Sequence, residues 1–155
     1  MVSSRGHYSL KKSADILGLG QDSVIAIPTD NNNKIDCQKL KEKCQELAEK
    51  NIRVLSIVGV AGTTETGNVD PLTDMAKIAH QYDCHFHVDA AWGGATLLSD
   101  KYRPLLKGIE LADSVTIDAH KQMYVPMGAG MALFKDPQNA NAVRHHAQYI
   151  LRSGS

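Results

Sequence analysis

Apolar and polar residues change their spacing several times along the chain, and each change marks a different predicted element. The stretch from Arg53 to Ala61 is nearly all apolar, which predicts a parallel strand that is covered on both faces. Shorter apolar or alternating runs, bounded by turn residues, predict four further strands. These runs are Val24 to Pro28, His85 to Val88, Ser114 to Ile117 and Ala129 to Phe134.

Helical spacing appears between these strands. A first helix is predicted from Ser9 to Ile16, with Ser9 as its cap, and the glycines Gly18 and Gly20 favour its end. A last helix is predicted from Asn139 onward. The two ends of the chain are therefore both expected to carry helices.

Two further helices have clearer start signals. Asp36 predicts the cap of a helix that extends to about Lys50. Asp70 and Pro71 predict the cap and first position of another helix. The stripes that these helices should bury are Leu40, Cys44 and Leu47 in the earlier one, and Leu72, Met75, Ile78 and Ala79 in the later one.

Strands that alternate with helices are typical of α/β proteins. The expected architecture is a mainly parallel sheet flanked by helices and connected by right-handed crossovers. The chain has 155 residues, the size of one ordinary domain, and shows no internal repeat, low-complexity tract or domain boundary. We therefore predict a single α/β domain over residues 1–155.

Two of the predicted strands lead to a titratable residue. His85 to Val88 is followed by Asp89 and a run of small residues, and Ser114 to Ile117 is followed closely by Lys121. Ligand crevices in open α/β sheets lie at the carboxyl ends of the strands, so neighbouring strands would place this acid and this amine in one pocket. Pyridoxal phosphate requires that pair, a lysine for a Schiff base and an acid against the pyridinium nitrogen.

Four motifs surround the pair. They are Gly6 to Lys12 (GHYSLKK), Gly62 to Gly67 (GTTETG), His87 to Gly94 (HVDAAWGG) and His120 to Gly130 (HKQMYVPMGAG). In this order and spacing they resemble the pyridoxal-phosphate-dependent group II amino-acid decarboxylases, which include glutamate decarboxylase and the bacterial aspartate 1-decarboxylases. The resemblance covers nearly the whole chain, and the last motif is most similar to the bacterial branch.

The resemblance implies a fold-type I pyridoxal-phosphate enzyme. The chain would be a central segment of the large cofactor-binding domain, incomplete at both ends. The implied activity is that of a carboxy-lyase that decarboxylates an L-amino acid, with glutamate or aspartate as the expected substrate. Fold-type I sites are completed across a homodimer, so the isolated segment is expected to be inactive.

The expected site has seven residues. Lys121 would form the Schiff base, and Asp89 would keep the pyridine nitrogen protonated so that the ring accepts the electron pair left by CO2. The remaining roles follow from the resemblance: Ala91 lies under the ring, His7 stacks on its other face, Thr64 lies near its substituents, and Ser114 and His120 contact the phosphate. Lys121, His7 and Asp89 form the expected catalytic set, with pyridoxal 5'-phosphate as cofactor.

One position departs from the family pattern. The commoner sequence before the lysine is Asn-Pro-His-Lys, whereas Asp118 and Ala119 stand here before His120 and Lys121. The added acid changes the local electrostatics. It either orients a neighbouring group or points away from the site.

Three alternatives accompany this interpretation. His85, His87 and Asp89 share one strand face and could form a facial metal triad. Such triads usually occur on antiparallel barrels, so no metal is expected. The same residues also suit another fold-type I activity, such as a diaminobutyrate or aromatic amino-acid decarboxylase or a lyase, or a non-catalytic fragment that retains the motifs.

The composition argues against a nucleic-acid-binding or membrane protein. Seventeen basic and seventeen acidic residues balance, which gives no charge excess to attract nucleic acid or anionic lipid. No apolar run approaches the roughly 18 residues of a membrane span. The three cysteines lack C-x-x-C spacing, and Cys37 and Cys44 are expected on one helix, so reduced thiols in a cytoplasmic protein are expected. The pair His145-His146 is expected on a solvated or interface face.

Overall fold

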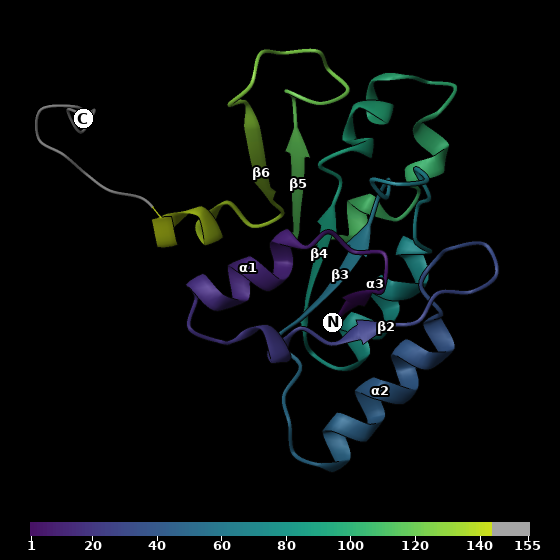
Figure 1. The fold of residues 1–155 in the computed structure, drawn as a ribbon, viewed down its shortest axis with the longest axis vertical. Coiled ribbons are helices and arrows are strands. Elements are labelled where there is room, and N and C mark those ends of the chain that lie inside the picture. Colours follow the sequence, from purple (N-terminus) through teal and green to yellow (C-terminus); the bar gives the residue numbers. More distant parts are fainter. Residues whose placement is uncertain (144–155) are drawn as a thin grey trace, which may run out of the picture.

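The computed structural model describes residues 1–143, and a six-stranded sheet forms its centre (Figure 1). The strands are β1 Val2–Ser3, β2 Ala26–Ile27, β3 Ser56–Val60, β4 His85–Asp89, β5 Ser114–Asp118 and β6 Gly130–Phe134. Their order across the sheet is β2-β1-β3-β4-β5-β6. The first five strands pair in parallel, and β6 pairs antiparallel with β5. The predicted mainly parallel α/β sheet is confirmed.

Within residues 1–143, three α-helices and four short 3₁₀ segments connect the strands, and a fifth 3₁₀ segment follows β6. The α-helices are α1 Ser9–Ile16, α2 Cys37–Glu49 and α3 Leu72–Gln81. The 3₁₀ segments are η1 Gln21–Ser23, η2 Gly93–Leu98, η3 Arg103–Leu106, η4 Ile109–Leu111 and η5 Pro137–Val143. Between β4 and β5 the chain therefore has short 3₁₀ turns in place of a long helix.

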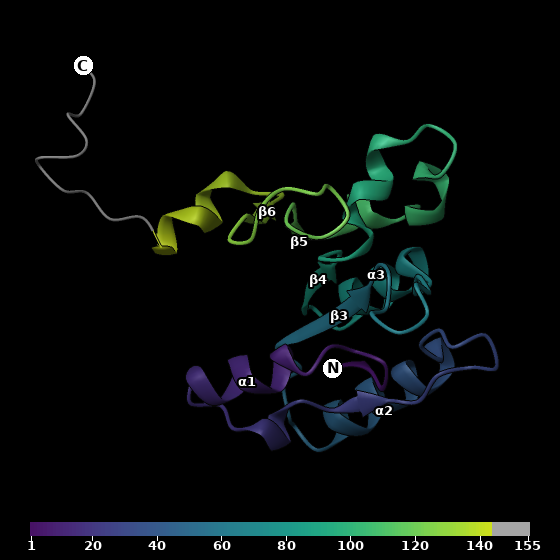
Figure 2. The same ribbon diagram turned by 45° about the horizontal axis from the view of Figure 1, so that its top comes forward.

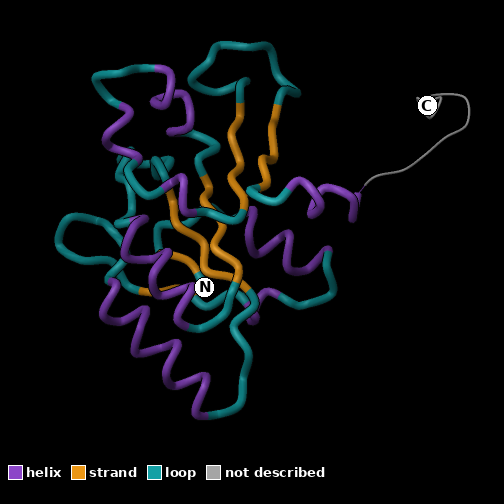
Figure 3. Tube along the Cα trace, turned by 180° about the vertical axis from the view of Figure 1, so that it is seen from behind, coloured by secondary structure: helices purple, strands orange, loops and turns teal. Residues whose placement is uncertain are grey.

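The two faces of the sheet are covered by different helices. On one face, side chains of α2 and α3 pack with Ile57, Phe86 and Val88 in the main core. Figure 3 shows the chain trace from behind, with its helices and strands. On the other face, Val2, Val58 and Val60 form a smaller cluster against Leu10 of α1. Burial on both faces explains why β3 is almost continuously apolar.

Helix α2 forms as predicted. Asp36 lies at its N-cap, and its side chain accepts hydrogen bonds from the backbone N–H groups of Gln38 and Lys39. Its predicted stripe is fully confirmed, since the buried residues are Leu40, Cys44 and Leu47. The stripe predicted for α3 is also buried, and it consists of Leu72, Met75, Ile78 and Ala79.

The predicted caps of the other two helices are wrong. Ser9 is the first residue of α1, and its backbone N–H donates to the His7 ring Nδ1 at 3.3 Å. Pro71 occupies the N-cap of α3, because the Asp70 carboxylate accepts tertiary hydrogen bonds from Ile35 and Val60 instead. In both cases the side chain that was predicted to cap the helix bonds to a residue outside that helix: Ser9 to His7, and Asp70 to Ile35 and Val60.

Strands β1 and β2 and the C-terminal region differ from the predicted elements. Strand β1 was not predicted, because two residues are too short to show a period. The strand predicted from Val24 to Pro28 shortens to β2. Near the C-terminus η5 projects away from the sheet (Figure 2). The continuation of the predicted last helix and its His145-His146 pair lie outside the described residues.

Within residues 1–143, every helix is too short or too polar to span a bilayer.

Candidate functional site

The carboxyl ends of the parallel strands meet around one cavity. Val60 of β3 pairs with Asp89 of β4, and Asp89 pairs with Thr116 of β5. The cavity at this edge has a volume of about 370 Å³, within the range of about 300–1,000 Å³ that is usual for small-molecule sites. Residues from the segments that follow β1, β3, β4 and β5 line it. This is the crevice expected of an open α/β sheet.

Asp89 supplies a carboxylate to the cavity wall. One of its oxygens, Oδ1, accepts a hydrogen bond from the Ala91 backbone N–H at 3.1 Å, which fixes the turn after β4. Gly93 permits that turn, since a Cβ atom there would collide with the backbone of Ala61. Among the described residues the second oxygen of Asp89 has no hydrogen-bond partner. The carboxylate is therefore held in place with one oxygen available to a ligand.

Lys121 reaches the cavity from the turn that follows β5. The turn closes through a hydrogen bond from the Lys121 backbone N–H to the Asp118 carbonyl at 3.2 Å. The Lys121 amine lies 2.9 Å from Asp118 Oδ2. With its amide oriented to satisfy both groups, Gln122 donates to the Trp92 carbonyl at 3.0 Å and accepts from the indole Nε1 at 3.1 Å. These contacts join the Lys121 turn to the Asp89 turn.

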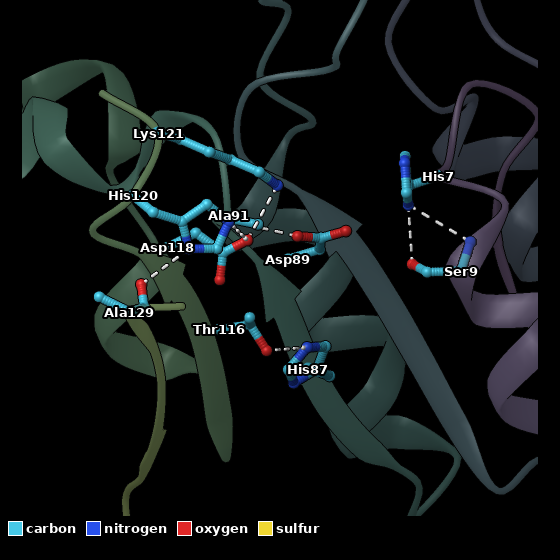
Figure 4. Close-up of polar contacts among 10 residues, drawn as sticks. All are labelled: His7, Ser9, His87, Asp89, Ala91, Thr116, Asp118, His120, Lys121 and Ala129. Carbon is cyan, nitrogen blue, oxygen red and sulfur yellow. Dashed lines mark hydrogen bonds and ion pairs between the residues drawn. The ribbon is translucent and has the colours of Figure 1, made fainter. Parts of the chain in front are cut away.

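His7 faces the same cavity from the α1 side. Figure 4 shows Lys121, Asp118 and Asp89 together and His7 across from them. The ring Nδ1 of His7 lies 2.8 Å from the Ser9 hydroxyl oxygen. The ring orientation is therefore set by the first residue of α1.

Thr64 lines the cavity from the loop between β3 and α3. Its neighbour Thr63 is buried, and the Thr63 hydroxyl bonds to the Thr66 hydroxyl at 2.9 Å and accepts from the Asn68 backbone N–H at 3.1 Å. The buried threonine anchors the loop. The exposed threonine is thereby left to face the cavity.

The histidines of β4 hold β5 beneath the cavity. The His85 Nε2 and His87 Nδ1 atoms lie 2.7 Å and 2.8 Å from the Ser114 hydroxyl oxygen. Burial, with a smaller contribution from His85, lowers the pKa of His87, although Asp89 opposes the shift. Within residues 1–143 no group of three or more His, Cys, Asp or Glu residues is arranged to hold a metal ion. The proposed triad residues are instead engaged in strand-to-strand hydrogen bonds and the Asp89 turn.

The structure brings together five of the seven predicted site residues. Lys121, Asp89, Ala91, His7 and Thr64 all line the cavity.

The other two predicted site residues do not line the cavity. Ser114 lies at the amino end of β5, and its hydroxyl is bonded to histidines, away from the strand ends. The His120 ring turns toward the Ala129 carbonyl, which lies 3.0 Å from Nδ1. Sequence resemblance identifies such positions but not the direction of their side chains.

Sequence reasoning missed several polar residues of the wall, among them Arg5 and Thr116. Thr116 was detectable, since it alternates with Asp118 on the same face of β5. Arg5 follows the two-residue strand β1, which has no sequence signal of its own.

The residues present fit pyridoxal phosphate. The cavity contains an amine that can bond to an aldehyde, and a carboxylate with one available oxygen for a protonated ring nitrogen. Ala91 belongs to the turn after β4 and adds only a methyl group to the wall, which leaves room for a flat ring. The donor set has the chemistry that the cofactor requires.

Three comparisons relate the chain to known proteins. The pyridoxal-dependent decarboxylase conserved domain matches residues 1–154. An aspartate 1-decarboxylase of Aliivibrio fischeri is 66% identical over 154 residues, which are 99% of this chain and 28% of that protein. An L-2,4-diaminobutyrate decarboxylase of Acinetobacter baumannii is 36% identical over 150 residues, which are 97% of this chain and 29% of that protein.

A solved structure shows the same fold. It is the glutamate decarboxylase domain of diaminobutyrate-pyruvate transaminase and L-2,4-diaminobutyrate decarboxylase from Vibrio parahaemolyticus. The TM-score is 0.88 at 34% identity, over 92% of this chain and 31% of that chain. The chain thus spans less than a third of the length of the relatives that it matches.

Proposed function

Because this chain belongs to the pyridoxal-dependent decarboxylase family, we propose that it carries the cofactor site of an amino-acid carboxy-lyase that acts on an acidic substrate. The observation that carries the proposal is the placement of Lys121 and Asp89 in one cavity at the carboxyl edge of a parallel sheet. When bound, pyridoxal phosphate supplies an aldehyde that combines with amines and a ring that accepts the electron pair left by departing CO2.

Each residue of the cavity has its own role in this proposal. The Lys121 amine is the group that bonds the cofactor and later yields its place to the substrate amine. Asp89 uses its available oxygen to hold a proton on the ring nitrogen. Ala91 and His7 line the space for the ring from facing sides (Figure 4), and Thr64 lines the same cavity. Ser114 and His120 have no part in this proposal.

An acidic substrate is supported by Arg5. Arg5 and Lys121 are the two Lys or Arg residues of the described cavity wall, and Lys121 is engaged by the cofactor chemistry. Arg5 Nη1 contacts one oxygen of Glu65 at 3.0 Å, and both side chains are exposed, so this pair contributes little stability and can change partner. A guanidinium fork binds a carboxylate with two parallel hydrogen bonds. The relative that is 66% identical carries the name aspartate 1-decarboxylase.

The test uses the full-length polypeptide that contains these residues, loaded with pyridoxal phosphate. CO2 and keto-acid formation are measured from aspartate, glutamate and 2,4-diaminobutyrate. We expect CO2 from an acidic substrate without keto acid, and no activity in Lys121→Ala. Lys107→Ala, which changes an exposed lysine outside the cavity, is the matched control and should keep full activity.

Three outcomes would contradict the proposal. Activity in Lys121→Ala would remove its central residue, and keto-acid formation would indicate an aminotransferase. Preferred turnover of 2,4-diaminobutyrate would replace the acidic substrate with a cationic one. The variant Arg5→Gln tests whether Arg5 selects an acidic substrate. It should raise the KM for aspartate and leave the KM for 2,4-diaminobutyrate unchanged or lower.

The proposal also covers the longer polypeptide, the oligomeric state and the cellular compartment. We place residues 1–155 in the middle of a longer cofactor domain that works as a homodimer. Exposed apolar side chains on β6, among them Leu133 and Phe134, are surfaces that additional chain or a second subunit would cover. The three cysteines are free thiols, which suits a reducing compartment such as the cytoplasm. Sedimentation of the full-length protein tests the dimer.

A further inference from the structure

Asp118 is a charged residue of the cavity wall for which the proposed chemistry has no role. It ends β5, lines the cavity with Lys121, and has a side chain that is 18% exposed. Its Oδ2 atom lies 2.9 Å from Lys121 Nζ and 3.8 Å from His120 Nε2 (Figure 4). The free lysine amine therefore already has a carboxylate partner in this structure.

The neighbouring strand leaves space for this carboxylate. Asp118 pairs with Gly130 across the antiparallel β5–β6 ladder. A Cβ atom at position 130 would lie 3.1 Å from Asp118 Oδ1, so a side chain there would displace the carboxylate by a few tenths of an ångström. The absence of a side chain at Gly130 thus allows the position from which Asp118 reaches Lys121.

We infer that Asp118 is a positioning residue that receives the Lys121 ammonium whenever this lysine is not bonded to the cofactor. The inference rests on the proposed function. When a substrate amine replaces Lys121, the protonated C=N double bond from the cofactor carbon to Nζ breaks as a protonated C=N double bond from that carbon to the substrate nitrogen forms. Nζ keeps its own proton and both electron pairs of the broken double bond, and it takes up the two protons that the substrate ammonium gives up, so it leaves as an ammonium group and atoms and charge balance.

The position of Asp118 favours the free form of Lys121 over the form bonded to the cofactor. A carboxylate within about 4 Å stabilises an ammonium group. Asp118 stabilises the released lysine in this way, and the bonded lysine no longer presents an ammonium group to it. The carboxylate therefore favours release of Lys121 and, with it, exchange for the substrate amine.

The test starts from the full-length polypeptide without cofactor and compares it with Asp118→Asn, which keeps the side-chain shape and removes the charge. Pyridoxal phosphate is titrated, and the fraction bonded to Lys121 is measured after borohydride reduction by peptide mass spectrometry. We expect half-maximal bonding in the variant at an approximately fivefold lower cofactor concentration, the effect of one partly exposed ion pair. Asp100→Asn removes a nearly fully exposed acid elsewhere and should behave like the parent protein.

A second ligand separates this role from a purely structural one. Pyridoxamine 5'-phosphate has an amine in place of the aldehyde and does not bond to Lys121, so its Kd should be the same in the parent and in Asp118→Asn. Gly130→Ala should shift cofactor bonding in the same direction as Asp118→Asn. It should add nothing when the asparagine is already present, because both changes act through one carboxylate.

Unchanged or weaker bonding of pyridoxal phosphate in Asp118→Asn would overturn the inference. An equal change in the Kd of pyridoxamine 5'-phosphate would also overturn it, since Asp118 would then shape the cavity in general. A parent protein in which no cofactor bonds to Lys121 would contradict the proposed function itself, so the two failures are distinguishable.

Discussion

Replacement of Asp70 by alanine should destabilise the protein more than any exposed acid does. Asp70 is 4% exposed, and its two oxygens accept hydrogen bonds from the buried backbone N–H groups of Ile35 and Val60 at 2.8 Å and 2.9 Å. Each buried donor left without a partner costs about 1–3 kcal/mol. Two such donors give about 2–6 kcal/mol, and relief of the buried carboxylate's desolvation reduces this to about 2–4 kcal/mol.

The loss should depend on pH in a defined direction. Burial raises the pKa of Asp70, although the N–H groups of Ile35 and Val60 and the nearby Lys34 oppose the shift. The folded state therefore binds this proton more readily than the unfolded chain. The contribution of Asp70 to the free energy of unfolding is complete below its ordinary pKa and declines as the pH rises through the folded pKa. The difference between parent and Asp70→Ala should consequently be larger at pH 5 than at pH 8.

Urea denaturation at these two pH values measures both effects. Asp70→Asn keeps one acceptor oxygen and should lose about half as much stability as Asp70→Ala. Asp74→Ala in the first turn of α3 breaks only an exposed ion pair with Lys77 and should cost about 0.5 kcal/mol. A loss in Asp70→Ala no greater than in Asp74→Ala, or a difference that grows from pH 5 to pH 8, would contradict this role of Asp70.

Three further predictions concern the site, a helix cap and a thiol. Asp89→Asn should still bond the cofactor to Lys121 but lower turnover at least about 100-fold; turnover within a few-fold of the parent would exclude the ring-nitrogen role. Asp36→Ala should lower the free energy of unfolding by about 1 kcal/mol in urea denaturation; no measurable loss would show that the two N–H bonds of this cap are dispensable. Burial, followed by the nearby acids Asp74 and Asp70, raises the pKa of the Cys37 thiol to about 11. Iodoacetamide at pH 8 should thus modify Cys37 about 100-fold more slowly in the folded protein than in urea, and equal rates by mass spectrometry would contradict this.

The parts of the fold that sequence reasoning predicted correctly are those that depend on periodicity. The buried stripes of α2 and α3 follow from a helical repeat, and β3 follows from a continuous apolar run, each long enough to recognise. The strand β1 was missed, because two residues carry no repeat. Asp70 was misassigned as a cap, because its partners lie 35 and 10 residues away in the chain. A local pattern contains no information about such tertiary donors.

Some features of the site could likewise be predicted from the sequence, and others could not. The placement of Asp89 and Lys121 in one cavity could be predicted, since strand ends and their order follow from the α/β pattern. Side-chain direction could not be predicted for Ser114 and His120, because each ring or hydroxyl turns toward a neighbour that the chain reaches only after folding. The Asp118–Lys121 contact depends on space left by Gly130 on the adjacent strand, and the pairing of Gly130 with Asp118 is set by the register of the folded sheet.

The identity of the lysine that bonds the cofactor decides whether the proposed site is correct. The full-length protein is incubated with pyridoxal phosphate, reduced with borohydride and digested, and the modified peptide is identified by mass spectrometry. We predict one cofactor per chain, attached to Lys121, and loss of this adduct in Lys121→Ala. Stoichiometric attachment at another lysine, or a parent protein that forms no adduct, would contradict it.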